Sequence, residues 1–145
     1  MKVLVSACLL GKNCKYNGGN NYSPEVINFL KNKEFIEICP EILAGMSAPR
    51  PPVEIVNGKV MDNSGRDLDK QYRLGVSKAM EMVKDQNISV AILQSRSPTC
   101  GVNQIYDGTF SRKLVSGQGI LAKALKDAGY EVIDVEDLKD YQETH

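Results

Sequence analysis

The sequence predicts an α/β protein with a small, open, mostly parallel sheet, helices on both faces in three Rossmann-like layers, and a short β-hairpin. Four short apolar runs, rich in β-branched residues, have the length of buried strands. Segments with helical periodicity alternate with these runs, which favours parallel pairing with right-handed crossovers. The predicted strands are Lys2–Ser6, Glu34–Ile38, Ser89–Leu93 and Tyr130–Val135.

The segments between these strands carry local signals for helices and for one hairpin. A helix is predicted to begin at Ser23, a capping residue that proline and glutamate follow. An Asn-Gly dipeptide inside Glu54–Met61 predicts a hairpin. Residues Asp67–Lys84 repeat apolar side chains at spacings of three and four, which predicts a helix with one apolar face. Two further helices are predicted at Gly117–Ala128 and Glu136–Tyr141.

Length and composition are those of an ordinary globular protein. The chain has 145 residues, which favours one domain over residues 1–145 with a core that needs no disulfides. Eighteen basic residues balance eighteen acidic ones, so the net charge is zero and nucleic acid is not expected as a partner. No apolar run reaches the roughly 18 residues that span a bilayer, so no membrane association is expected.

Cysteine usage indicates metal binding or catalysis in a reducing compartment. The apolar stretch before Cys8, Val3–Ala7, is shorter than the roughly 7–15 residues of a signal-peptide core, so a cytoplasmic location is predicted. In that compartment, four free thiols favour metal or catalytic roles over disulfides. The single histidine, His145, is the last residue, and Cys–His nucleophilic catalysis is therefore not expected.

Three cysteines follow the ends of predicted strands. Cys8 and Cys39 come just after the first and second strands, and Cys100 lies in the loop after the third. Ligand sites of open parallel sheets form outside the carboxyl ends of the strands, so these thiols are predicted to converge in a cleft. Three thiolates suit zinc or an iron–sulfur cluster, but the long separations differ from the close pairs of zinc ribbons. Burial of each cysteine as a small apolar residue is the alternative.

A cuboidal cluster on three cysteines leaves one iron without a protein ligand, and that iron is available as a Lewis acid. Cys14 lies apart in a polar loop and is either a bystander or a fourth ligand that closes the site.

Polar residues beside the cysteines are candidates for catalysis and substrate binding. Glu41 is a candidate general acid or base, or else an acid in the first turn of a helix. Arg50 and Arg96 are candidates to bind an anionic or carbonyl substrate or to neutralise a thiolate-bound cluster; structural salt bridges are the alternative. Ser97 is a candidate to orient substrate or to bond a cluster sulfur, with a turn-forming role as the alternative.

Five motifs give the sequence a specific resemblance. They are SACLLG, CPE, PRPPVEI, RSPTCG and YDGTF, in that order between Ser6 and Phe110. Together they closely resemble a bacterial family long called a domain of unknown function, which includes the thiouracil desulfidases. The resemblance implies a 4Fe–4S cluster on Cys8, Cys39 and Cys100, with one iron free for the sulfur of a substrate. It also implies assistance from a glutamate and a serine, for which Glu41 and Ser97 are the matches.

The leading hypothesis is cluster-dependent, non-redox desulfuration of a thiolated nucleobase or a similar small thiocarbonyl compound. Its expected partners are a small-molecule substrate and the iron–sulfur assembly machinery. Exposure to air during preparation is expected to remove the cluster. The alternatives are a redox- or metal-sensing module without turnover, and a zinc-dependent hydrolase.

Overall fold

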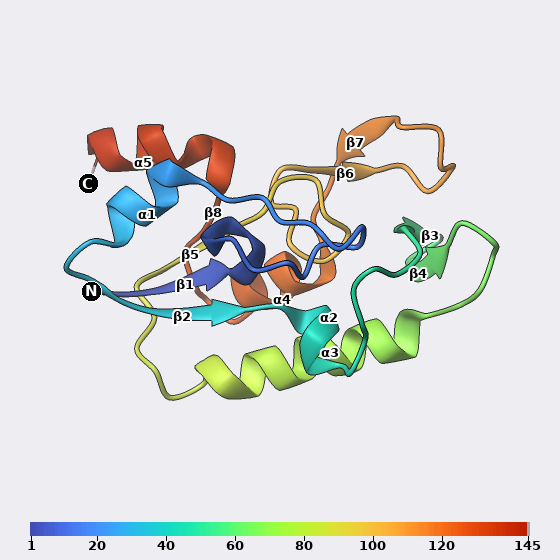
Figure 1. Ribbon diagram of the computed structural model, residues 1–145, viewed down its shortest axis with the longest axis horizontal. Coiled ribbons are helices and arrows are strands. Elements are labelled where there is room, and N and C mark those ends of the chain that lie inside the picture. The colour runs from blue at the N-terminus through green and yellow to red at the C-terminus, as the bar shows by residue number, and fades with distance from the viewer. Residues whose placement is uncertain (145) are drawn as a thin grey trace.

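A four-stranded, all-parallel sheet forms the centre of the molecule (Figure 1). The computed structural model describes residues 1–144, and the expectation about His145 falls outside them. The strand order is β2-β1-β5-β8, and each neighbouring pair is parallel. The strands are β1 (Lys2–Ser6), β2 (Glu34–Ile38), β5 (Val90–Leu93) and β8 (Val132–Asp134). All four predicted strands are therefore present, and the α/β prediction is confirmed.

Helices cover both faces of this sheet, as predicted. On one face, α1 (Pro24–Leu30) and α5 (Leu138–Thr144) pack on Val3 and Val5 of β1. On the other face, α3 (Asp69–Val83) and α4 (Ile120–Asp127) pack on Leu4. Neighbouring residues of a strand point to opposite faces, so one short strand supplies both halves of the core. The remaining helical segments are η1 (Ala7–Leu10), α2 (Pro40–Leu43) and η2 (Val135–Asp137).

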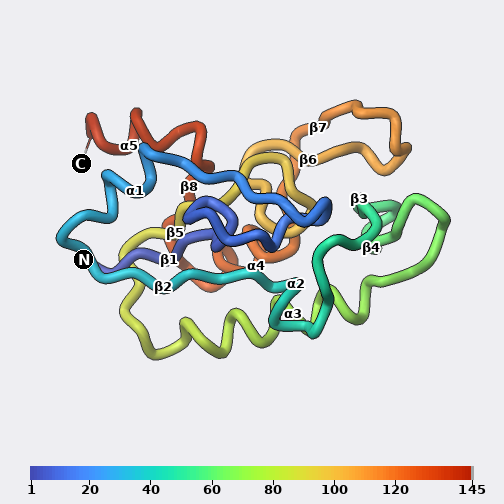
Figure 2. Tube along the Cα trace, viewed as in Figure 1, coloured from blue at the N-terminus to red at the C-terminus, as the bar shows by residue number. Residues whose placement is uncertain are grey.

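Two small antiparallel hairpins lie beyond the carboxyl ends of the parallel strands, as the chain trace in Figure 2 shows. The hairpin of β3 (Val53–Val56) and β4 (Lys59–Asp62) was predicted from its Asn-Gly turn. The hairpin of β6 (Gln104–Tyr106) and β7 (Leu114–Ser116) was not predicted. Every residue of β7 is exposed, so the strand lacks the alternation of buried and exposed side chains that reveals a strand in a sequence.

The two hairpins are joined by a buried carboxylate on β3. Oε1 of Glu54 accepts hydrogen bonds from the backbone N–H groups of Gly108 and Phe110, at 3.0 and 3.1 Å. Gly108 has a positive φ of 93°, and a Cβ there would lie 2.6 Å from the carbonyl oxygen of Ile55. The turn that precedes β7 therefore packs directly against β3, and only glycine fits at the contact.

A glycine in α3 lets α2 approach closely. A Cβ added to Gly75 would lie 2.1 Å from the carbonyl oxygen of Pro40, the first residue of α2. Because α2 is only four residues long, its position depends on this contact with α3. Gly75 thereby helps to position Glu41, the second residue of α2.

We predict that Gly75→Ala lowers the free energy of unfolding by roughly 1–3 kcal/mol, because the added methyl group overpacks against α2. Helix propensity alone predicts the opposite sign, a gain of about 1 kcal/mol. Urea unfolding of the two proteins measures the difference. The matched control is Ser77→Ala, an exposed position of the same helix, where a change within about 0.5 kcal/mol is expected. Stabilisation by Gly75→Ala would contradict the close contact.

Candidate metal centre and active site

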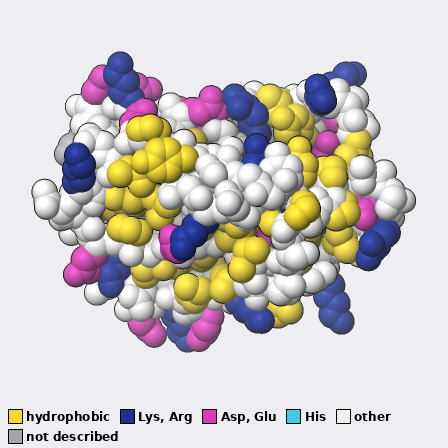
Figure 3. Space-filling view, viewed as in Figure 1, with side chains coloured by type: hydrophobic (Ala, Val, Ile, Leu, Met, Phe, Trp, Pro, Cys, Tyr) yellow, Lys and Arg dark blue, Asp and Glu magenta, His cyan; other side chains and the backbone are white. Residues whose placement is uncertain are grey.

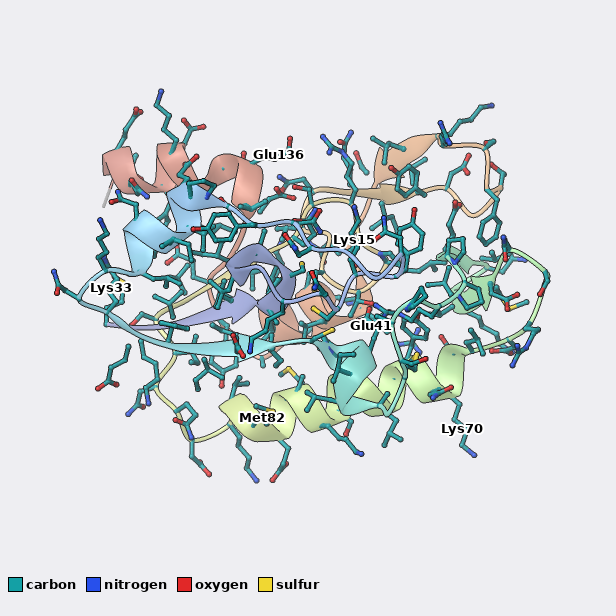
Figure 4. All side chains as sticks on the ribbon, in the orientation of Figure 1. Lys15, Lys33, Glu41, Lys70, Met82 and Glu136 are labelled. Carbon is teal, nitrogen blue, oxygen red and sulfur yellow. The ribbon has the colours of Figure 1, made fainter. Side chains whose placement is uncertain are left out.

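The parallel strands bring three cysteines to one edge of the sheet. Ser6 of β1 pairs with Ile38 of β2, so these two strands end at the same level. Cys8 then lies in η1, Cys39 directly precedes α2, and Cys100 lies in the loop after β5. All three line a cavity of about 830 Å³ at the carboxyl ends of the strands. Sulfur atoms gather there around Glu41, which is labelled in Figure 4.

Cys14 lines the same cavity and connects two of these cysteines through its thiol. Cys14 hydrogen-bonds to the thiols of both Cys8 and Cys39. Its place is fixed through the backbone, because its carbonyl oxygen accepts a 2.9 Å hydrogen bond from Arg50 Nη2. The thiols of all four cysteines are free. The polar loop after η1 therefore contributes a fourth sulfur to the group.

The thiols differ in how readily they ionise. The hydrogen bond from Cys14, together with one from Asn21 Nδ2 at 3.6 Å, lowers the pKa of Cys8 although burial opposes this. The hydrogen bond to Cys14 and burial raise the pKa of Cys39. For Cys14 itself, the bond from Cys39 favours the thiolate, but the bond to Cys8 and burial raise its pKa to about 11. Cys8 is therefore the thiol of this group that ionises most readily.

Cys100 is held rigidly beside this chain. Ser97 Oγ accepts hydrogen bonds from the backbone N–H groups of Thr99 and Cys100, both at 3.1 Å. The start of α4 holds the same loop, since Gly119 N–H donates to the carbonyl of Gly101 at 2.8 Å and Leu121 N–H to that of Thr99 at 2.9 Å. Burial raises the pKa of the Cys100 thiol, and the nearby Glu41 adds to this shift.

Glu41 is a buried carboxyl group at the centre of the site. Its Oε1 accepts a 2.6 Å hydrogen bond from the Thr99 hydroxyl, and its Oε2 accepts one from the Cys39 thiol at 3.4 Å. Only 8% of the residue is exposed. A carboxyl group fixed between a hydroxyl and a thiol, at the wall of a cavity, has the position that a general acid or base requires.

The two predicted substrate-binding arginines lie in different surroundings. Arg96 lines the cavity but pairs with Glu136 at 3.0 Å, and both side chains are about half exposed. The Arg50 guanidinium lies deeper, next to the Tyr72 side chain, and its buried Nε has no hydrogen-bond partner among residues 1–144. Burial and the charge of Glu41 raise the pKa of Tyr72 to about 12. Of these two arginines, Arg50 is therefore the one with an N–H group that has no hydrogen-bond acceptor among residues 1–144.

The residues around the cavity fit an iron–sulfur cluster better than a single metal ion. Within residues 1–144, no three His, Cys, Asp or Glu side chains are arranged around one common ion position. A cuboidal cluster distributes its thiolates over several irons, so its ligands need not meet at one point. Sulfur is the soft donor that such a cluster binds, and four cysteines line the wall of this cavity.

Sequence reasoning missed the two contacts that organise the site. Thr99 belongs to the motif RSPTCG and Glu54 to the motif PRPPVEI, but neither residue was predicted to have a role in the site. The pairing of Thr99 with Glu41 spans 58 residues of chain and leaves no local pattern. Tyr72 carried only the signal of a core helix position, although it also lines the cavity.

The surface around the site carries both signs of charge. On the face drawn in Figure 3, Lys and Arg side chains alternate with Asp and Glu side chains. Among residues 1–144, we find no helix whose length and apolar character would let it cross a bilayer.

Comparison with known protein families identifies the family to which this chain belongs. The family model described as 2-thiouracil desulfurase matches residues 3–137, which is nearly the whole chain. The chain belongs to the 2-thiouracil desulfurase family. The matched range contains all four cysteines as well as Glu41 and Ser97.

Similar proteins support membership of the 2-thiouracil desulfurase family. The uncharacterized protein YbbK of Bacillus subtilis (strain 168) is 40% identical over 148 residues, covering 95% of this chain and 98% of YbbK. Among solved structures, the 4Fe–4S-dependent thiouracil desulfidase TudS superposes with a TM-score of 0.89 and 31% identity. That match covers 96% of this chain and 93% of TudS.

We predict that iodoacetamide labels Cys8 faster than Cys39 or Cys100 in the cluster-free protein at pH 8. Thiolate is the reactive form, and the lowered pKa of Cys8 leaves more of it ionised at this pH, whereas the raised pKa values of the other two keep them protonated. Mass spectrometry after brief labelling measures the order. Labelling in urea, where the four rates should become similar, is the control. Faster labelling of Cys100 would contradict the thiol arrangement.

Proposed function

We propose that this protein removes sulfur from a thiolated nucleobase or a similar small thiocarbonyl compound, using a 4Fe–4S cluster on Cys8, Cys39 and Cys100. The observation that carries the proposal is the convergence of these thiols on one cavity together with the buried Glu41. Family membership and the likeness to TudS support it. When bound, a cluster of this kind supplies an iron without a protein ligand, which acts as a Lewis acid toward sulfur.

Glu41 is the proposed general base. Its carboxylate takes a proton from a water molecule, and the oxygen of that water attacks the carbon of the thiocarbonyl group. The Thr99 hydroxyl holds Oε1 of the carboxylate, so its position is set before substrate arrives. Binding of a cluster by Cys39 as a thiolate removes the S–H donor to Oε2 and leaves that oxygen open to water. The carbon–oxygen bond forms and the carbon–sulfur bond breaks. The products are a carbonyl compound and hydrogen sulfide, and no oxidant or reductant is consumed.

Three further residues have proposed roles around the substrate. Ser97 shapes the loop of Cys100 through its two backbone contacts, and its hydroxyl proton remains available to a sulfur or a substrate atom. The Arg50 guanidinium donates to a substrate carbonyl. Arg96 lies at the more exposed part of the cavity, where its pairing with Glu136 leaves it a weaker role in binding.

The proposed cofactor also implies a cellular setting. A reducing compartment such as the cytoplasm keeps four free thiols available for cluster assembly. There the iron–sulfur assembly machinery of the cell would load the cluster.

We predict that protein reconstituted with iron and sulfide in the absence of oxygen releases sulfide from 2-thiouracil. Glu41→Gln should lower kcat by roughly 10²–10⁴-fold, the usual contribution of a general base, while iron and sulfide contents stay unchanged. Colorimetric sulfide assays and ultraviolet detection of uracil measure the rate.

The matched control for Glu41→Gln is Glu34→Gln, since Glu34 is exposed at the opposite end of β2 and should leave kcat unchanged. Fully loaded protein that releases no sulfide from thiolated pyrimidines would exclude this substrate class.

The hydrogen bonds of Cys14 to two predicted ligands favour one competing function, a sensing module in which four thiolates close the cluster. Substitution of this cysteine distinguishes the two functions. We predict that Cys14→Ser retains both the absorption of the cluster near 400 nm, at roughly the wild-type iron content, and sulfide release, whereas Cys100→Ser loses both because thiolates are the cluster ligands. Loss of the cluster in Cys14→Ser would instead support the sensing module.

A further inference from the structure

One carboxylate oxygen of Glu54, a residue on the cavity wall, forms no hydrogen bond with residues 1–144. Glu54 lines the cavity from β3, and only 9% of the residue is exposed. Its Oε1 takes both hydrogen bonds from Gly108 and Phe110, while its Oε2 makes none with any residue between 1 and 144. No lysine or arginine forms an ion pair with Glu54 in the same part of the chain. A carboxylate oxygen that has no protein partner and belongs to a cavity-lining residue is free to accept a hydrogen bond from a ligand.

Arg50, four residues earlier in the chain, also lines the cavity and has one nitrogen without a hydrogen-bond partner. Arg50 Nε is buried and lacks a hydrogen-bond partner among the residues described. The rest of the guanidinium is held by the carbonyl oxygens of Cys14 and Ser47, so the group cannot turn freely to water. The wall formed by residues 50–54 therefore offers one acceptor and one donor, both fixed by contacts to the protein.

We propose that Glu54 is a specificity-determining residue whose Oε2 accepts a ring N–H of the substrate, while Arg50 donates to the adjacent ring carbonyl. This assignment rests on the proposed function. It defines the substrate class as cyclic compounds that carry the sequence C(=S)–N–H–C(=O), in which the sulfur points to the cysteines. The 2-thio and 4-thio forms of uracil both present this edge, whereas cyclic thioureas without a carbonyl group do not.

Glu54 is suited to ligand recognition because its Oε1 is already held by hydrogen bonds to the protein backbone. Two backbone N–H groups on Oε1 fix the plane of the carboxylate, so little side-chain entropy is lost when a ligand binds. This hydrogen bond is made to a part of the ring that does not react, so it is equally strong in the ground state and in the transition state. Its loss should therefore raise KM and leave kcat nearly unchanged.

The test compares the reconstituted wild-type protein with Glu54→Gln and Asp107→Asn. Glutamine keeps an oxygen for Gly108 and Phe110 but replaces Oε2 by an N–H₂ group, which repels the ring N–H. Asp107→Asn is the matched control, because Asp107 hydrogen-bonds Thr109 within the same turn. Five constants are measured: the Kd for uracil by calorimetry, KM and kcat for 2-thiouracil, and KM and kcat for 3-methyl-2-thiouracil.

We expect Glu54→Gln to raise both the Kd for uracil and the KM for 2-thiouracil by roughly 10–100-fold, with kcat within about threefold. The 3-methyl compound lacks the N–H between the thiocarbonyl and carbonyl groups, so it should be a poor substrate for the wild type. Glu54→Gln should remove most of the difference between the two substrates. Asp107→Asn should change each constant by less than about threefold, as expected of a turn residue that does not line the cavity.

Three outcomes would overturn the assignment of Glu54. They are unchanged uracil affinity and KM in Glu54→Gln, equal effects of Glu54→Gln and Asp107→Asn with lowered melting temperatures, and no binding of uracil by the wild type. Failure of the proposed function is distinguishable, because calorimetry with uracil involves no turnover. Protein that binds uracil through Glu54 but releases no sulfide would retain the recognition site and exclude desulfuration.

Discussion

Parallel pairing of β1 with β2 and β5 is the constraint on which the rest of the structure depends. Cys8, Cys39 and Cys100 are remote in the chain, and only the alignment of three strand ends brings them to one cavity. Side chains of β1 pack alternately into both halves of the core, so a register shift of one residue would bury the wrong face of the strand. The hydrophobic effect that fixes this register therefore also fixes the arrangement of the thiols.

The cavity wall is completed by elements that have little core of their own. The short helix α2 depends on its contact with Gly75 of α3, and the β3–β4 and β6–β7 hairpins are joined by the Glu54 carboxylate. Thr99 and Glu54 therefore each have two roles: they hold two distant segments together, and they form part of the site. Such buried polar contacts are stable only when their partners are satisfied. Among residues 1–144, Arg50 Nε is the buried side-chain nitrogen or oxygen atom that lacks a partner, and Arg50 lines the cavity.

Much of this architecture was predictable from local sequence patterns. The apolar runs gave the four strands, the Ser23 cap and the periodicity of Asp67–Lys84 gave two helices, and the position of Cys39 directly after a strand placed it at the sheet edge. Local patterns fail where long-range contacts decide the outcome. The loop that carries Cys14 is rich in Gly and Asn and has no periodicity, so its return to the cysteines rests on a hydrogen bond from Arg50, 36 residues later.

Every proposed role depends on one point, namely that strand-end thiols hold an iron–sulfur cluster in this cavity. A crystal structure of the anaerobically reconstituted protein, with anomalous diffraction recorded at the iron edge, tests it most directly. We expect a compact group of iron atoms bonded to Cys8, Cys39 and Cys100, next to Glu41. Iron bonded elsewhere, or a cavity in which any of these three sulfurs stays unbound beside a formed cluster, would contradict the account.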